Sequence, residues 1–440
     1  MVSFLIMNKI IYVDETTGMF SYSYFDNDEN HYIDYEEIIT SFSPTFITIC
    51  LCVSNACNFN CEYCFNKKKN NKKMTFELAK KIIDKMIDIE FPYCDKYYVD
   101  VSGYGEPLLN LDCILKINKY CQEKSDLIRK EILVSFVSNG YLLTKEVVNV
   151  LQNSGIIFGI SIDGDKITHN KKRKTISEQD TYDIILNNVK NIEKKEFLGC
   201  AVTLSTPTIS LETIIDSLLP YFNTISIKPV RESSSPISLS TIDRWNQEYS
   251  NLARRILNDA RKNNVKILKS LINGDDYFGK FLYRSILKNL TINRCDYGIS
   301  RFCFTEDGKM FGCAPATSYE ELRMPFVNAN YYFKKQVEDT KKTCSSCPFY
   351  LFCGGECFIE TKINNSKNSS LCSLKKHLIQ LSLYISLELE TNFPFVFYQI
   401  YEFCKEKQKR FSINKELYEF LSLHENYSFN EGKEIFYSLK

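Results

Sequence analysis

The sequence predicts an α/β protein whose main body is a partial (β/α)6 TIM-type barrel, followed by a small cysteine-rich domain and a helical C-terminal tail. Three observations predict this arrangement. Apolar, β-branched or aromatic runs alternate six times with helical patterns, eight cysteines crowd into short turn-rich segments after them, and apolar periodicity returns after Lys375. Alternating strand–helix units imply a parallel sheet with right-handed crossovers, and six units are fewer than the eight of a closed barrel. We therefore expect an open barrel.

The chain starts with a predicted β-rich lead over residues 1–45, where a hairpin pairs Lys9–Val13 with Phe20–Phe25. The barrel is expected over residues 46–270. Its strands are predicted at Phe46–Val53, Tyr97–Val101, Ile132–Val137, Ile156–Ile162, Leu198–Leu204 and Thr224–Val230. Its first helix carries an apolar stripe, with Thr75 as the candidate N-cap. The stripe consists of Leu78, Ile82, Ile83, Met86 and Ile89, and the later helices are predicted at Leu111–Gln122, Lys145–Asn153, Asp180–Lys194, Leu211–Tyr221 and Ile242–Asn263.

The rest of the chain divides into a bridge over residues 271–294, the cysteine-rich domain over 295–374 and a helical extension over 375–440. The cysteine-rich domain has too little periodic apolar pattern to fold without staples. The lead hairpin offers an edge for strand addition, and the helical extension could grip a peptide. We expect both segments simply to pack against the barrel.

The composition excludes several classes of protein. The 440 residues carry a net charge of +1, so no strong field marks a nucleic-acid or anionic-membrane partner. Neither a signal peptide nor a long apolar span is evident, which predicts a soluble, cytoplasmic protein. Eighteen cysteines in such a chain favour metal binding over disulfides.

The first cysteine group, Cys57, Cys61 and Cys64, follows the first predicted strand. Three thiolates on one loop can hold three irons of a cubane cluster and leave the fourth iron open. A zinc site would normally need a fourth ligand nearby. Chance cysteines or a small zinc loop remain the alternatives.

The C-x-x-x-C-x-x-C spacing, with Tyr63 before the last cysteine, resembles the radical S-adenosylmethionine (radical SAM) superfamily. The resemblance implies a [4Fe–4S] cluster whose open iron chelates the amino and carboxyl groups of S-adenosylmethionine. An electron from the cluster would then cleave the S–C5′ bond, and the resulting 5′-deoxyadenosyl radical would abstract hydrogen from the substrate. Tyr63 would pack beside the adenine.

Two strand-end motifs extend the resemblance. Gly103-Tyr104-Gly105-Glu106-Pro107 is similar to the GGEP motif of the family, although Tyr104 displaces the first glycine. Gly105 permits close approach of the backbone, and Glu106 can accept hydrogen bonds from a cationic group such as the methionyl ammonium. Ser138 ends the third strand and would reach the ribose or carboxylate of the cofactor. An ordinary turn is the alternative for the GGEP-like segment.

The fourth strand ends in Ser161-Ile162-Asp163-Gly164, followed by His169 and Arg173. This stretch resembles a segment of peptide-modifying members of the family. There the serine and arginine, Ser161 and Arg173 here, help to hold the cofactor. The aspartate, Asp163 here, lies toward the substrate. The alternatives are a simple turn residue for Asp163 and a surface loop for His169.

The later cysteines resemble the SPASM extension of such enzymes, with the pattern C-x(9–15)-G-x4-C, gap, C-x2-C-x5-C-x3-C, gap, C. The resemblance implies two auxiliary [4Fe–4S] clusters, for a total of three, and two zinc sites are the alternative. Some relatives lack a counterpart of Cys303 and leave one iron open. The alternative for Cys303 is a free buried thiol. Cys295, Cys303, Cys313 and Cys357 would hold the first auxiliary cluster, and Cys344, Cys347, Cys353 and Cys372 the second. The remaining cysteines are expected in the core: Cys50, Cys52, Cys94, Cys113, Cys121, Cys200 and Cys404.

The resemblance implies a maturase that installs a thioether or another crosslink in a ribosomally made precursor peptide. Its electron donor would be a flavodoxin or ferredoxin. Oxidation of a sulfatase cysteine or serine to formylglycine is the alternative, but Ala314 stands where such enzymes carry an aspartate base. A non-enzymatic iron–sulfur electron carrier is the third candidate, and it would not need cofactor motifs at several strand ends.

Overall fold

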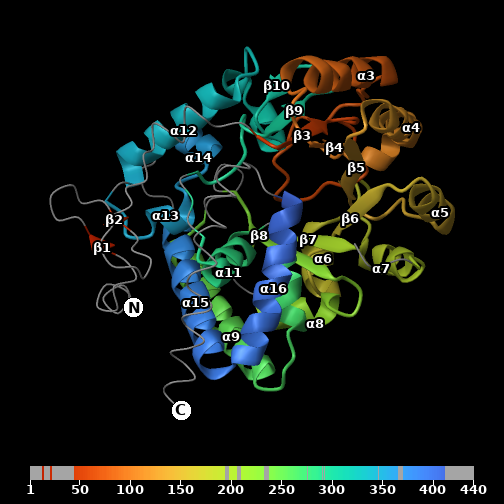
Figure 1. Ribbon diagram of the computed structural model, residues 1–440. Coiled ribbons are helices and arrows are strands. Elements are labelled where there is room, and N and C mark those ends of the chain that lie inside the picture. The colour runs from red at the N-terminus through yellow and green to blue at the C-terminus, as the bar shows by residue number, and fades with distance from the viewer. Residues whose placement is uncertain are drawn as a thin grey trace.

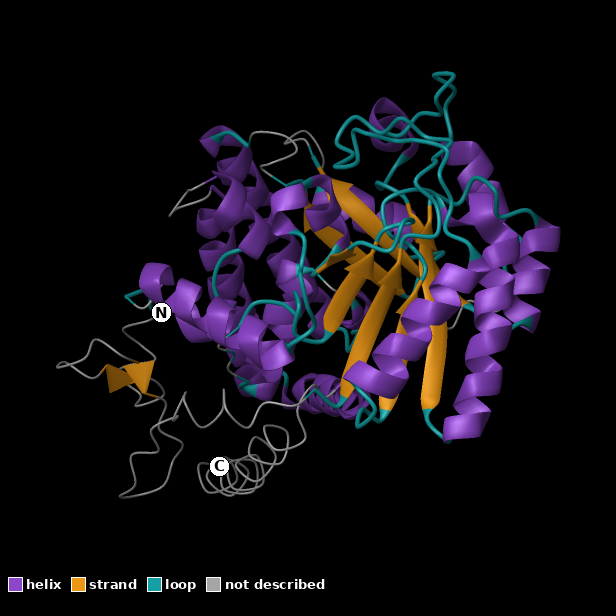
Figure 2. Ribbon diagram, turned by 90° about the horizontal axis from the view of Figure 1, so that it is seen from above, coloured by secondary structure: helices purple, strands orange, loops and turns teal. Residues whose placement is uncertain are grey.

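An open sheet with helices packed around it forms the body of the protein (Figures 1 and 2). The computed structural model describes residues 12–13, 20–21, 44–193, 198–205, 210–231, 237–274, 276–289, 291, 293–344, 346–364 and 370–411. The sheet has eight strands in the order β10-β9-β3-β4-β5-β6-β7-β8. These strands are β3 (Phe46–Leu51), β4 (Lys96–Asp100), β5 (Glu131–Ser138), β6 (Ile157–Ser161), β7 (Gly199–Leu204), β8 (Thr224–Pro229), β9 (Arg301–Phe304) and β10 (Met310–Phe311).

The six strands β3 to β8 run parallel in sequence order, which confirms the predicted partial barrel. They are separated by helices, as the alternating pattern predicts. These helical segments are α3 (Phe76–Asp84), η1 (Lys85–Glu90), η2 (Pro107–Asn110), α4 (Leu111–Ile128), α5 (Lys145–Asn153), α6 (Lys166–Lys172), α7 (Tyr182–Lys190) and α8 (Leu211–Leu218). After β8 come α9 (Leu239–Ala260), α10 (Lys266–Asn273) and α11 (Tyr277–Leu287).

The cysteine-rich region begins as part of the barrel sheet. Strand β9 pairs in parallel with β3, and β10 returns antiparallel to β9 through a turn in which Gly308 has a φ of +84°. Glycine adopts this left-handed conformation without a Cβ clash. The region continues through η3 (Ala314–Ser318), η4 (Glu320–Leu322), α12 (Ala329–Cys344), α13 (Tyr350–Cys353) and α14 (Phe358–Asn364).

The two faces of β3 meet different surroundings. Ile47, Ile49 and Leu51 belong to the main apolar core, which the surrounding helices complete. Cys50, on the alternate face, packs with Cys52 and Cys303 in a separate small cluster. Because successive side chains of a strand alternate between faces, the strand buries both of its sides.

The first barrel helix matches its predicted start but not its predicted length. The Thr75 hydroxyl accepts a hydrogen bond from the Leu78 N–H at 3.2 Å, as a helix N-cap does. The chain then widens into the π-helical turn η1, and Ile89 is 71% exposed. The prediction of a buried Ile89 was wrong, because a π turn shifts the register of the following side chains relative to an α-helix.

The C-terminal segment is helical, with α15 (Ser370–Asn392) packed against α9 and α11, and α16 (Pro394–Phe411) packed against α11 and α15. Residues 412–440 lie outside the described residues. In the lead, β1 (Tyr12–Val13) and β2 (Phe20–Ser21) pair antiparallel. The rest of the two expected strands also lies outside the described residues. None of the helices in the described ranges combines the length and apolar character needed to span a membrane.

Candidate active site

The first three site cysteines lie on the loop that follows β3. Cys57, Cys61 and Cys64 are all partly buried, and none is in a disulfide. The Phe59 side chain is fully buried and anchors the loop, while its backbone N–H donates to Cys57 Sγ at 3.4 Å. Burial raises the pKa of Cys57 to about 11 and also raises the pKa of Cys61, whose thiol interacts electrostatically with both neighbouring cysteines. Iron binding at this loop must therefore displace thiol protons.

The GGEP-like segment packs directly against this cysteine loop. A Cβ added to Gly105 would lie 2.1 Å from the Ser54 carbonyl oxygen and 2.5 Å from that of Ala56. The next residue, Glu106, donates its backbone N–H to Ala56 O at 2.8 Å. Only glycine leaves room for this approach, so Gly105 fixes the distance between the two loops.

The Glu106 carboxylate joins the second and third strand-end motifs. It is 2% exposed and accepts hydrogen bonds from the Ser138 hydroxyl and the Asn139 N–H, both at 2.8 Å, and from the Leu108 N–H at 3.2 Å. Ser138 Oγ in turn accepts from the Gly140 N–H at 2.9 Å. Burial raises the pKa of Glu106, although these donors oppose the rise. Both residues thus hold the turn together, and their direct contact with a cofactor stays a prediction.

The buried Asp163 and Arg173 form one polar group with the partly buried Tyr63. The Tyr63 hydroxyl donates to Asp163 Oδ2 and accepts from Arg173 Nη1 at 2.7 Å. Asp163 Oδ1 lies 4.0 Å from Arg173 Nη1 and accepts from the Thr203 N–H at 2.9 Å. Burial raises the pKa of Asp163, although Arg173 opposes the rise. Tyr63, expected beside an adenine, is oriented by this group, and Ser161 lies partly exposed at the end of β6.

His169 is a buried support for this group rather than a surface residue. Its side chain is 0% exposed, and Nδ1 accepts from the Asp163 N–H at 3.2 Å. The Thr181 hydroxyl donates to the Arg173 carbonyl at 2.6 Å, so its contact with His169 Nε2 at 3.0 Å requires a proton on that nitrogen. Burial, aided by Arg173, lowers the pKa of His169 to about 2. The ring is therefore neutral. It positions Asp163 through the backbone N–H of that residue, and Arg173 through Thr181.

Two donors in the site fit a ligand rich in acceptors. Asn58 Nδ2 and Arg173 Nε are buried and lack a hydrogen-bond partner among the described residues. The Asn58 amide is oriented by Asn139, whose Nδ2 donates to Asn58 Oδ1 at 2.7 Å. Buried donors without partners are costly. The carboxylate and ribose oxygens of S-adenosylmethionine are acceptors of the required kind, so the residues fit this cofactor.

Sequence reasoning missed a network that ties this site to the cysteine-rich region. Glu306, in the turn between β9 and β10, accepts from the Tyr104 hydroxyl and from Asn55 Nδ2, the latter at 3.3 Å. Asn66 Nδ2 bonds Asn55 Oδ1 at 3.0 Å and Tyr104 O at 3.1 Å. The only signal in the sequence was Tyr104 itself, in the place of a motif glycine.

Four of the later cysteines meet at one place. Cys344, Cys347, Cys353 and Cys372 line a common pocket together with Glu356 and Lys375. Lys375 is 2% exposed, and its Nζ lies 2.8 Å from Glu356 Oε2. Four thiols around one pocket are the donor set of a [4Fe–4S] cluster, as the resemblance implies for these residues.

Cys295, Cys313 and Cys357 form another group, packed with Tyr297 and Phe311. Two guanidinium groups accompany it. Arg231 Nη1 donates to Cys357 Sγ at 3.3 Å, and Arg294 and Arg231 together lower the pKa of Cys357 even though burial opposes them. Buried positive charge of this kind favours a thiolate over a thiol.

Cys303 does not lie where the sequence reasoning grouped it. It was expected with Cys295, Cys313 and Cys357, but strand register places it opposite Cys50. Its Sγ lies 3.5 Å from both Cys50 Sγ and Cys52 Sγ, at 0% exposure. The thiol points toward β3 because parallel pairing puts the side chains of Cys50 and Cys303 on the same face. The other expected core cysteines are buried, as predicted.

Active sites of open and closed barrels form at the carboxyl ends of the strands. That edge here carries the three-cysteine loop and the buried polar groups, the arrangement expected of a barrel enzyme. Residues 51–219 match the model of the Radical SAM superfamily and form a radical SAM domain. This class uses S-adenosylmethionine and a [4Fe–4S] cluster.

Two curated relatives illustrate the sequence similarity. An uncharacterised protein of Methanocaldococcus jannaschii is 36% identical over 115 residues, which are 26% of this chain and 38% of that protein. The radical SAM cyclopropyl synthase TigE of Paramaledivibacter caminithermalis is 24% identical over 366 residues, covering 75% of this chain and 72% of TigE. The matched part thus spans only about two fifths of the first relative.

Solved structures share the fold over most of the chain. Native anSMEcpe with bound AdoMet, a sulfatase maturase, has a TM-score of 0.63 at 17% identity and covers 79% of this chain and 99% of its own. The same protein is known with AdoMet and the Kp18Cys peptide, at a TM-score of 0.61. Streptococcus suis SuiB bound to its precursor peptide SuiA has a TM-score of 0.50 at 13% identity, covering 79% and 82%. At these identities the likeness concerns the fold.

Proposed function

We propose that the protein is a radical SAM peptide maturase that modifies a ribosomally made peptide by forming a thioether or another crosslink. The observation that carries the proposal is the Tyr63–Asp163–Arg173 group with its partnerless donor, beside the loop of Cys57, Cys61 and Cys64. A structural ion pair alone would not leave Arg173 Nε buried and unused.

The site residues would have three roles: binding the cluster, binding the cofactor and positioning both. Cys57, Cys61 and Cys64 would hold the cluster, and Arg173 and Asn58 would donate to the cofactor's oxygens. Cluster and S-adenosylmethionine together supply a radical that abstracts hydrogen from the substrate. Glu106 sets the turn that faces the cofactor, and the Tyr63 hydroxyl, held between Asp163 and Arg173, keeps its ring in one orientation.

A peptide substrate is supported by the solved structures that share this fold. The fold neighbours anSMEcpe and SuiB are both known with bound peptides.

The later cysteines would hold the auxiliary clusters. Cys344, Cys347, Cys353 and Cys372 offer four ligands for one cluster, whereas Cys295, Cys313 and Cys357 offer three for the other. The electron released in the reaction would enter these clusters, and a flavodoxin or ferredoxin would serve as the external donor. Three cubanes remain the proposed content of the chain.

Sulfatase maturation is the second candidate, favoured by the fold likeness to anSMEcpe. Ala314 argues against it, because it packs against the thiols of Cys50, Cys52 and Cys303 and supplies no base. We therefore rank crosslink formation first.

The test starts from anaerobically reconstituted protein with S-adenosylmethionine and dithionite, and measures 5′-deoxyadenosine by mass spectrometry. Cys61→Ala should abolish its release, whereas Cys121→Ala, a buried core change, should leave it intact. Release that persists in Cys61→Ala would refute the assignment. The enzyme should then crosslink a short peptide encoded beside its gene. The mass of that peptide should fall by the mass of the hydrogen atoms that crosslink formation removes.

A further inference from the structure

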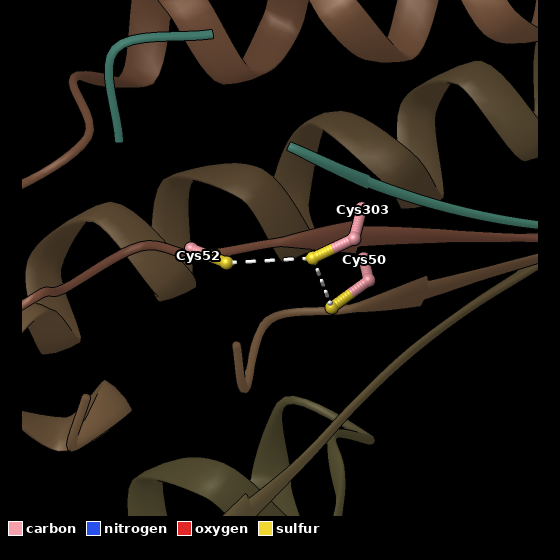
Figure 3. A group of neighbouring side chains, drawn as sticks. All are labelled: Cys50, Cys52 and Cys303. Atoms are coloured by element: carbon pink, nitrogen blue, oxygen red, sulfur yellow. Dashed lines mark hydrogen bonds between the residues drawn. The ribbon is translucent and has the colours of Figure 1, made fainter. Parts of the chain in front are cut away.

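Three buried thiols outside the proposed cluster sites converge on one point of the sheet (Figure 3). Cys50 lies in β3, Cys52 follows it, and Cys303 lies in β9. Their exposures are 3%, 0% and 0%. Cys303 Sγ is 3.5 Å from both other sulfurs, and all three sulfurs lie within 4.8 Å of one another. Among the described residues, no other group of three cysteine, histidine or acidic ligand atoms is this compact.

The backbone fixes this arrangement before any ligand arrives. Cys50 and Cys303 are register partners in adjacent parallel strands, and the Cys52 N–H donates to Phe304 O at 2.9 Å. Gly103 closes the third side, since a Cβ there would lie 2.5 Å from Cys52 Sγ. Two strands and a tight turn therefore hold the three thiols together without a flexible loop.

The spacing suits a single ion and not a cubane. In a tetrahedral zinc site the Zn–S bonds are about 2.3 Å, which separates the sulfurs by about 3.8 Å. The distances of 3.5 Å from Cys303 Sγ to the other two sulfurs need to increase by only a few tenths of an ångström to reach about 3.8 Å. Thiolates are soft ligands that select zinc-type ions over magnesium or calcium.

Nearby charged residues can help to balance the negative charge of three thiolates and a bound cation. Asp100 is the register partner of Cys50 on the other side of β3, and its Oδ2 lies 3.4 Å from Arg301 Nη1. Tyr104 and Ala314 pack against the thiols from the remaining side. A divalent cation together with Arg301 offsets most of the negative charge that three thiolates and Asp100 would bring into the interior.

We propose that Cys50, Cys52 and Cys303 bind one zinc ion, separate from the iron–sulfur clusters. The ion joins β3 to β9 and thereby ties the start of the cysteine-rich region to the strand that leads into the Cys57 loop. A water molecule would supply its fourth ligand. The proposal does not depend on the reaction that the enzyme performs.

The experiment uses the full chain, loaded anaerobically with iron and sulfide, exposed to zinc chloride and then freed of loose metal. Elemental analysis should find about one zinc per chain in the wild type and in Cys121→Ala, as one closed site requires. Cys303→Ala should hold less than a tenth of that zinc but keep its iron. Cys344→Ala should keep its zinc, which separates the site from the auxiliary pocket.

A measurement on the unmutated protein makes the test independent of folding defects in the variants. Zinc-edge X-ray absorption should show about three sulfur neighbours at about 2.3 Å. Wild-type protein without bound zinc, or a zinc edge dominated by oxygen or nitrogen, would overturn the proposal. So would a disulfide between Cys303 and Cys50 or Cys52 in anaerobically purified chain, or equal zinc in wild type and a folded Cys303→Ala.

Discussion

Replacing Gly105 with alanine should separate the cofactor motif from the cysteine loop. The added methyl group would lie 2.1 Å from Ser54 O and 2.5 Å from Ala56 O, whereas real Cβ contacts under 3.0 Å are essentially absent from proteins. Both obstacles are backbone atoms that cannot rotate away, so one of the two loops must move. We expect a cost of about 3 kcal/mol, at the upper end of overpacking. It includes about 1 kcal/mol for the Glu106 N–H to Ala56 O bond.

The same change should also slow the release of 5′-deoxyadenosine. A displacement of about 1 Å at a positioning element costs on the order of 100-fold in rate. We therefore expect 5′-deoxyadenosine release to fall about 100-fold in Gly105→Ala. The melting temperature should fall by about 1 °C for each kcal/mol, because the unfolding entropy grows with the 440 residues of the chain.

Gly155→Ala is the matched control for this change. Gly155 has a φ of +69° and no atom within 4 Å of an added Cβ. It should cost about 1 kcal/mol through backbone strain alone and leave turnover unchanged. If Gly105→Ala released 5′-deoxyadenosine at the rate of Gly155→Ala, the close packing of the two loops would not matter for cofactor binding.

Three further predictions concern the buried polar group and the cysteines. Arg173→Lys loses the planar fork, so binding of S-adenosylmethionine measured at equilibrium should weaken about tenfold or more, and an unchanged affinity would contradict its role. His169 has a pKa of about 2 in the folded chain against about 6.5 unfolded, so its contribution to stability is complete above pH 6.5 and declines as the pH falls. The stability advantage of wild type over His169→Gln should shrink by up to about 1.4 kcal/mol per pH unit below that value in melts between pH 7.5 and 5.5, and an advantage that grows in acid would refute the neutral ring. Cys344→Ser should lower the iron content from about twelve to about eight per chain, while Cys113→Ser should leave it at about twelve. A wild-type iron count near four would rule out both auxiliary clusters.

The barrel strands were predictable because each is an apolar run buried by the helices around it. The predicted strand Leu198–Leu204 differs from β7 by a single residue. Helix starts were also predictable where a side chain caps them, as Thr75 does for α3. In both cases the signal lies within a few neighbouring residues, which is the range that periodicity and capping rules cover.

The contacts that the sequence did not predict join residues far apart in the chain. Cys52 and Cys303 are 251 positions apart, and nothing local specifies that β9 pairs with β3 in the register that brings them together. The spacing of the cysteines pointed to a shared cluster for Cys303, but register determined its neighbours. Likewise, Tyr104 could be identified as a departure from a motif, whereas its partner Glu306 depends on that same pairing.

The pairing of β9 with β3 also bears on how the protein is made. During translation, β3 leaves the ribosome long before residues 301–304, so one side of this strand keeps its N–H and C=O groups open until then. Thr48 N and Cys52 N find their acceptors only in Ser300 and Phe304. An exposed strand of this kind invites pairing with other chains. A fragment that stops before Arg301 should therefore aggregate, and the smallest unit able to fold must include the β9–β10 hairpin.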